Sequence, residues 1–174
     1  MKKTMQLLLN RKGVAALEFA LLMPFMIAIW GLIIEYSNLQ SAARKLNVAA
    51  QSLADVIAQE EFVTRASLTN ALEIPAVIMR PYPTDTLTVG IQSIEADRNG
   101  NISVGWSAGT NVGSPPGIAS SLVNRSDSTI HVVVRYTYEP VLGNMIPPEF
   151  LPGFINMRQE AYARPRLTTI ISLR

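Results

Sequence analysis

The sequence contains no cysteine and a single histidine, His131, among its 174 residues. Without cysteine there is neither a disulfide framework nor a thiolate metal site, and cysteine usage gives no information on the redox state of the compartment. His131 has no nearby pair of carboxylates in the sequence and falls opposite the apolar face of a predicted strand. We therefore interpret it as a solvated or sheet-packed histidine rather than a metal ligand or a catalytic base.

The sequence also lacks a Gly-rich phosphate loop, a Ser-centred elbow and zinc-ligand spacing. Residues 97–101, Asp-Arg-Asn-Gly-Asn, share the start of a calcium loop but lack its terminal Glu and lie between two predicted strands. A hairpin turn is the favoured interpretation. We predict no catalytic activity, no cofactor and no bound metal.

The net charge of +2 arises in the first residues of the chain. Four of the fifteen basic side chains are Lys2, Lys3, Arg11 and Lys12, and without them eleven basic residues face thirteen acidic ones. The basic balance therefore belongs to an N-terminal leader, which argues against electrostatic binding of nucleic acid.

Residues 14–34 form an apolar run in which Glu18 is the one charged residue. About twenty such residues are enough to cross the roughly 30 Å hydrocarbon core of a bilayer, and we predict a transmembrane helix over residues 14–36. Because the leader charges precede this run, the positive-inside bias predicts a cytoplasmic N-terminus and an extracytoplasmic remainder. A cleaved secretory signal is the less favoured alternative, with Ser41-Ala42-Ala43 as its cleavage site.

Glu18 is costly in a membrane segment, by about 2.5–3.5 kcal/mol on insertion scales. It could reach toward the headgroups near Arg11 and Lys12. Alternatively, cleavage after Gly13 would make Val14 the first residue and Glu18 the fifth.

Residues 11–19, Arg-Lys-Gly-Val-Ala-Ala-Leu-Glu-Phe, resemble the prepilin motif of type IV pilins, in which a basic leader ends in Gly and the fifth mature residue is Glu. The short leader, the Glu-Phe pair and the following Ala-Leu-Leu-Met-Pro more narrowly resemble the TadE/TadG-like pseudopilins of tight-adherence (Flp-type IVb) pilus systems. Residues 131–140 and 161–166 are similar to late strands of that family. Phe19 stands where the major Flp pilins carry Tyr, which favours a minor subunit.

The resemblance implies that a prepilin peptidase cuts the Gly13–Val14 bond, where the absence of a Cβ lets the backbone approach closely. It implies that Glu18 pairs with the new α-amino group of Val14 on a neighbouring subunit. The implied partners are this peptidase, other pilin and pseudopilin subunits, the assembly machinery and membrane lipids. Pro24, in the middle of the span, predicts a kink or a locally melted turn.

Leu39, Leu46 and Leu53 recur every seven residues and predict a helical seam. The membrane helix is thus expected to continue as a stalk to about Gln59. After a proline-broken linker over residues 74–83, alternation predicts a hairpin with a tight Asn99-Gly100 turn and an irregularity near Gln92. Its apolar faces are predicted to be Leu87, Val89 and Ile91 on one strand and Ile102, Val104 and Trp106 on the other.

Further strands are predicted over residues 129–139, 155–163 and 167–173, and exposed loops over residues 109–128 and 143–153. The predicted fold class is α+β: a long N-terminal transmembrane and stalk helix packed on a small antiparallel sheet, as in pilins. The predicted organisation is a leader (1–13), a transmembrane helix (14–36), a stalk helix (37–63) and a β-rich head (64–174).

The leading hypothesis is therefore a minor pilin or pseudopilin of a bacterial inner membrane, single-pass with a periplasmic head. It would act in assembly of a tight-adherence pilus, in secretion and in surface adhesion, and its incorporation into the filament is left open. The rival is a permanently anchored envelope protein whose β domain binds a ligand or regulates a neighbour. A secreted hydrolase is a third class.

Overall fold

The computed structural model describes residues 11–110, 112–113, 126–143, 149 and 152–174, with side chains from Val14 onward. These residues divide into two compact units, Met1–Asn38 and Leu39–Arg174. The predicted loops over residues 109–128 and 143–153 lie largely outside the described residues, as do Lys2 and Lys3 of the leader.

Helix α2 spans Arg11–Ala58 and supplies all of the described secondary structure of the first unit. The α-helix continues through Pro24 without a break. The stretch Val14–Ala58 is long and apolar enough to cross a membrane, and none of its most apolar window is buried inside the protein. Leu17 and Leu21, for example, are 72% and 70% exposed. This unit therefore keeps its apolar surface on the outside.

In the second unit, the last turns of α2 form one wall of the core. Leu46 and Leu53 are fully buried and Leu39 packs partly buried against the same cluster. Small residues on the same stripe, Ala42 and Ala50, let the helix approach its neighbours closely. The predicted seam is confirmed, and the helix ends at Ala58, one residue before Gln59.

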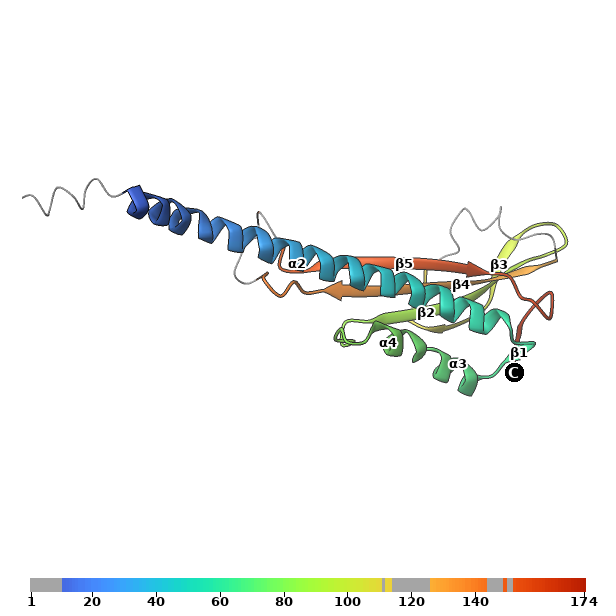
Figure 1. Cartoon of the computed structure of the whole chain (residues 1–174). Helices are drawn as coiled ribbons and strands as arrows, with labels where there is room; N and C mark the ends of the chain where they lie inside the picture. Colours follow the sequence, from blue (N-terminus) through green and yellow to red (C-terminus); the bar gives the residue numbers. More distant parts are fainter. Residues whose placement is uncertain (1–10, 111, 114–125, 144–148, 150–151) are drawn as a thin grey trace, which may run out of the picture. The chain divides into compact units, whose positions relative to one another are not determined.

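The sheet has four antiparallel strands in the order β3-β2-β4-β5. Their bounds are β2 (Thr88–Ala96), β3 (Ile102–Gly109), β4 (Ser128–Tyr138) and β5 (Ile155–Ala163). Strands β4 and β5 lie side by side in Figure 1. The predicted hairpin and the predicted strands over residues 129–139 and 155–163 are confirmed, as is the α+β class.

The hairpin contains a β-bulge. The alternation of apolar residues in the sequence indicates its approximate position but not the strand that carries it. Ser93 pairs with Trp106 and Ile94 pairs with Val104, so Gly105 is the extra residue, on β3. The predicted irregularity near Gln92 is confirmed, but the prediction that Trp106 shares a face with Ile102 and Val104 is wrong. An inserted residue reverses the facing of everything beyond it, and Trp106 joins the core that contains Ile91.

Two short helices lie between the end of α2 and the sheet, where the sequence predicts the end of the stalk and a linker. Strand β1 (Phe62–Val63) is followed by α3 (Arg65–Ala71) and α4 (Ile74–Met79). Thr64 and Ser67 form a capping box at the start of α3. The prediction that proline breaks regular structure over residues 74–83 is wrong for residues 74–79, which form α4. Pro75 is in the first turn of this helix, where its missing N–H breaks no helical hydrogen bond.

The predicted strand over residues 167–173 is also wrong. Only Ser172–Leu173 (β6) is a strand, and it pairs in parallel with β1 outside the four-stranded sheet. The preceding backbone bonds to other elements: Arg166 N–H donates to the carbonyl of Ala58, and the carbonyls of Thr169 and Ile171 accept from Ser128 and Trp106. The backbone of residues 166–171 therefore uses these hydrogen bonds in place of pairing with a neighbouring strand.

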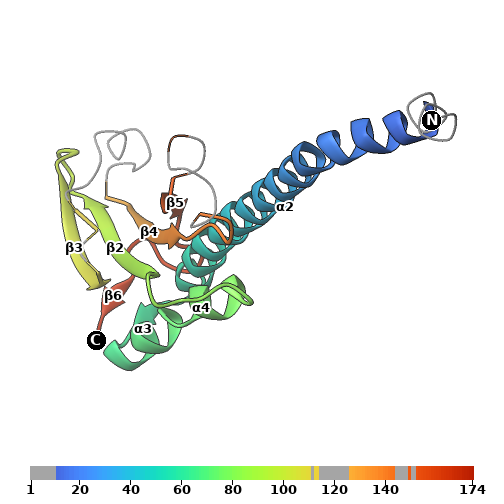
Figure 2. The ribbon, with the colours of Figure 1, turned by 90° about the vertical axis from the view of Figure 1, so that its left-hand side faces the viewer.

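All three helices of this unit pack on one face of the sheet. Residues of α2, α3 and α4 share a single apolar cluster with alternate residues of β2, β3 and β4. Figure 2 shows these helices gathered beside the strands. On β4 the core residues are those predicted: Ile130, Val132, Val134, Tyr136 and Tyr138. The opposite face of the sheet therefore carries the intervening residues of β4, from Thr129 to Thr137.

Candidate assembly segment and a buried histidine cluster

The sequence-predicted processing residues all lie at the start of α2. Gly13 and Val14 are helical, so the Gly13–Val14 bond is part of the first turns of the helix. No acidic residue stands in the first turn, while Arg11 and Lys12 do. Positive charges at a helix N-terminus oppose the helix dipole, and glycine costs about 1 kcal/mol relative to alanine in a helix. This end of α2 is therefore weakly stabilised.

Glu18 and Phe19 follow on the exposed surface of the same helix. Phe19 is 58% exposed and Val14 is 55% exposed, and Glu18 is also exposed. Because residues four apart lie on one face, Glu18 stands one turn beyond Val14 on the same side of α2. The backbone nitrogen of Val14, which cleavage after Gly13 would convert into an α-amine, is thus one helical turn from the position of Glu18. Pro24 lies further along the same helix.

A second polar arrangement, which sequence reasoning missed, lies on the helix-free face of the sheet. His131 is 1% exposed and pairs in the strand register with Tyr162, and the two rings stack with centroids 4.5 Å apart. Its Nδ1 lies 3.0 Å from Gln92 Nε2 and its Nε2 lies 3.1 Å from Glu160 Oε2. An amide N–H can only donate, so Nδ1 accepts and the proton is on Nε2.

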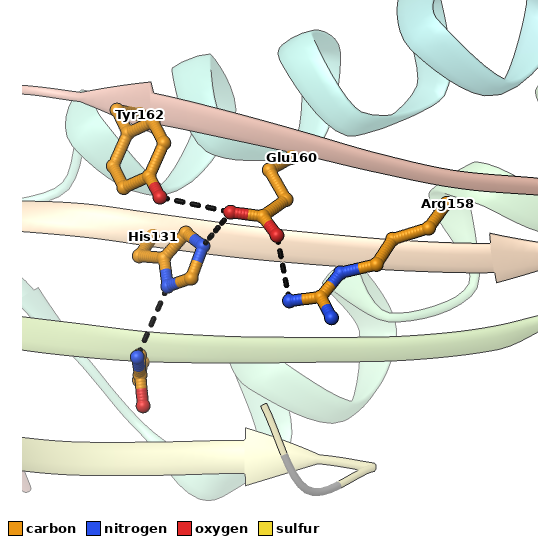
Figure 3. Close-up of polar contacts among 5 residues, drawn as sticks. His131, Arg158, Glu160 and Tyr162 are labelled. Atoms are coloured by element: carbon orange, nitrogen blue, oxygen red, sulfur yellow. Dashed lines mark hydrogen bonds and ion pairs between the residues drawn. The ribbon is translucent and has the colours of Figure 1, made fainter. Parts of the chain in front are cut away.

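Glu160 links this histidine to two further groups, as Figure 3 shows. The Tyr162 hydroxyl donates to Glu160 Oε2 at 2.9 Å, and Arg158 Nη2 lies 2.6 Å from Oε1. Burial alone would raise the pKa of Glu160, but hydrogen bonds from Tyr162 and His131 and the charge of Arg158 outweigh it and lower that pKa. Burial and the bond to Glu160 raise the pKa of Tyr162 to about 12.

Burial lowers the pKa of His131, against the opposing effect of Glu160. The histidine is therefore neutral at physiological pH, with both ring nitrogens engaged and almost no exposed surface. A catalytic base needs an accessible nitrogen within reach of a substrate proton. In this cluster both nitrogens of His131 already have partners and the ring is buried. Its signal in the sequence was the two-residue spacing of Arg158, Glu160 and Tyr162, which puts them on one strand face.

No metal site is formed by the residues that the structure describes, since no three His, Asp or Glu side chains there come together. Asp97 instead caps the β2–β3 turn. Its carboxylate accepts from the backbone N–H groups of Asn99 and Asn101 and from the Asn101 side chain. These hydrogen bonds lower the pKa of Asp97, and the bond from the Asn101 side chain has the largest effect. The hairpin-turn interpretation is the one that the geometry bears out.

The sheet and the exposed helix define an α+β protein that has, among the residues described, one N-terminal helix long and apolar enough to cross a membrane. Residues 13–55 match the family model described as TadE-like protein. This match, over the first part of α2, supports a TadE-like protein of the Tad pilus system, a family that is associated with pilus machinery and other pilins and is not known as enzymatic. Neither a curated protein nor a solved structure matches the chain.

Proposed function

We propose that this chain is a minor pilin or pseudopilin that a prepilin peptidase cuts after Gly13. The processed subunit, beginning at Val14, takes part in assembly of a tight-adherence pilus and in the secretion and adhesion that depend on it. It has no catalytic activity of its own. In this proposal the N-terminus is cytoplasmic before cleavage and the sheet unit is periplasmic.

The observation that carries the proposal is the position of Glu18 among exposed side chains that are otherwise apolar, over residues 14–30 of α2. Large apolar side chains such as Leu17 and Leu21 need lipid or other helices around them. A carboxylate among them is expensive unless a cation accompanies it. Cleavage after Gly13 would supply that cation as the α-amino group of Val14, on the same helix face.

The helix start supports cleavage at this bond. A peptidase acts on an extended backbone, so the first turn of α2 must unwind before the Gly13–Val14 bond is cut. Glycine and the unfavourable charges of Arg11 and Lys12 reduce the cost of that unwinding. The amine formed can pair with Glu18 of its own chain in the membrane and exchange to Glu18 of a neighbour on assembly.

Intact-protein mass spectrometry of the membrane-derived chain tests the proposal. We expect a mature N-terminus at Val14 in cells that contain the peptidase and the full leader in cells without it. Gly13→Val should block cleavage, whereas Gly31→Val, in the same helix, should not. A chain that keeps residues 1–13 beside an active peptidase would refute the proposal and favour the permanently anchored envelope protein.

A further inference from the structure

Strands β4 and β5 end in a tip that exposes large apolar side chains. Val141, shortly after the end of β4, is 75% exposed, the highest value among the large apolar residues that the structure describes. Phe154, which immediately precedes β5, is 62% exposed. Gly143 and Gly153 lie side by side, since a Cβ on Gly143 would be 3.6 Å from Gly153 Cα. Val141 and Phe154 therefore lie at the same end of the sheet, and we call these two residues the β4–β5 tip.

The sequence of this connection is also apolar. Residues 139–154 contain several large apolar side chains, two acidic residues, Glu139 and Glu149, and no basic one. Connections between strands are normally polar, and exposed apolar side chains that lie together mark a contact with lipid or with another protein. Because acidic side chains are not attracted to anionic lipids, any contact with lipid here depends on apolar surface and not on charge.

The β4–β5 tip lies at the end of the sheet unit where α2 enters it. Lys45 Nζ, near the start of this part of α2, donates to the main-chain carbonyl of Arg80 at 2.8 Å. The ring of Tyr82, two residues further on, packs edge-on against the ring of Tyr138, with centroids 6.4 Å apart. Tyr138 is the last residue of β4. These contacts place the end of β4 beside the segment that Lys45 holds.

The opposite end of the unit lies at the C-terminus of α2. Arg166, shortly after β5, bonds to the Asp55 carboxylate at 3.0 Å and donates its main-chain N–H to the carbonyl of Ala58 at 2.9 Å. In Figure 1 the arrow of β4 points away from β1, the strand that follows α2. Within the sheet unit, the β4–β5 tip is therefore at the end where α2 begins, at Leu39.

Leu39 is joined to the apolar run by a short piece of chain. Ile34, the last residue of that run, is five positions before Leu39, and five residues reach at most about 18 Å even when fully extended. With the apolar run in a bilayer, this end of the sheet unit is therefore held close to the membrane surface. A weak contact is sufficient there, because the tether makes the second contact intramolecular.

We propose that the β4–β5 tip inserts Val141 and Phe154 into the headgroup region of the bilayer that holds α2. Segments that lie in this region bury their apolar side chains about 5–10 Å into the boundary between headgroups and acyl chains. A second point of contact restricts rotation of the sheet unit at the membrane surface and so orients the subunit before assembly. The inference rests on the proposed function, through the insertion of α2, and deepens it.

Fluorescence of single labelled positions tests this contact in the full chain, because the protein has no cysteine of its own. Val141→Cys and Phe154→Cys each carry a nitrobenzoxadiazole label in phosphatidylcholine vesicles. Leu167→Cys is the matched control, since Leu167 is 65% exposed and lies beside Arg166 at the opposite end of the unit. Nitroxide-labelled phosphatidylcholine should quench both tip labels several-fold more than the control, and aqueous iodide several-fold less. Quenching at the tip equal to that at Leu167 overturns the proposal.

A charge at the tip supplies a second test. In the labelled Val141→Cys chain, Phe154→Asp should lower quenching by the nitroxide lipid at least several-fold, because a carboxylate resists transfer out of water. Val141→Asp in the labelled Phe154→Cys chain is the reciprocal variant, and Leu167→Asp is the control. Both tip residues are exposed, so the urea midpoint should not change. Quenching that Phe154→Asp and Val141→Asp leave unchanged, or that 1 M salt abolishes, contradicts an apolar contact.

Two further measurements separate lipid contact from other outcomes. Nanodiscs that hold one chain each should give the same lipid quenching at the tip. Protection from iodide that appears only when several chains share a bilayer would assign the tip to a contact between copies and overturn the proposal. Leu21→Cys reports insertion of the apolar run. Lipid quenching at Leu21 without quenching at the tip overturns this inference and leaves the proposed function standing, whereas no quenching at Leu21 overturns both.

Discussion

The indole Nε1–H of Trp106 donates to the main-chain carbonyl of Ile171 at 2.7 Å, and both residues are buried. This bond ties the outer strand of the hairpin to the C-terminal segment. We expect Trp106→Phe to lower the free energy of unfolding by about 1–3 kcal/mol, because it leaves a buried carbonyl without its donor. Urea unfolding followed by far-ultraviolet circular dichroism would measure this. Trp30→Phe, at an indole that is 66% exposed, should leave the midpoint unchanged.

Gly90 is expected to tolerate no side chain. A Cβ there would collide with the Thr110 carbonyl and lie 2.7 Å from Val112 Cγ2. Displacing a backbone carbonyl strains the surrounding structure, so Gly90→Ala should lower the free energy of unfolding by about 1–3 kcal/mol. At Gly105 a Cβ would meet only the end of the Glu95 side chain, which can rotate away. Equal losses in Gly90→Ala and Gly105→Ala would show that backbone crowding is not the cause.

The stability of the sheet unit should fall on mild acidification because of His131. Its folded pKa lies below the ordinary value of 6.5, so the unfolded chain takes up a proton first as pH falls through that value. Its contribution to stability is present above pH 6.5 and is lost toward the folded pKa. Since His131 is the only histidine, urea midpoints between about pH 7.5 and 5.5 report mainly on it.

His131→Gln is the corresponding variant, because it removes the titrating group while keeping a polar side chain. It should cost about 1–3 kcal/mol at neutral pH, since Glu160 and Gln92 lose a buried partner. It should also flatten the slope of stability against pH in this window. A slope unchanged from the unmodified chain would assign the pH dependence to another group.

Glu18→Ala should leave membrane insertion intact and impair assembly. Loss of the proposed pair between Glu18 and the Val14 amine, taken as about 1.4 kcal/mol or more, predicts a tenfold or greater fall in assembled subunit. Shearing of surface filaments and co-purification with other pilins would measure it. Leu17→Ala, the neighbouring exposed position, controls for altered apolar surface. Normal piliation in Glu18→Ala would count heavily against the pairing.

The paired strands were predictable because they depend on local alternation. The alternation of Ile130 to Tyr138 gives the buried face of β4, and Ile155 to Ala163 were recognised with their observed ends. The sequence could not place the bulge at Gly105 of β3. A shift in the alternation shows that side chains change from one sheet face to the other, but it does not show which of the two strands carries the extra residue. Helix α4 was missed because proline was read as a breaker where it begins a helix.

By itself the sequence determined the long apolar helix, its single carboxylate and the sheet class, because each follows from spacing between residues close in the chain. Only the tertiary structure decided that His131 stacks on Tyr162 and bonds to Glu160, and that Arg135 faces Arg158. These partners lie more than twenty residues apart along the chain, and strand register alone brings them together. Register depends on packing of the whole unit, which no local pattern contains.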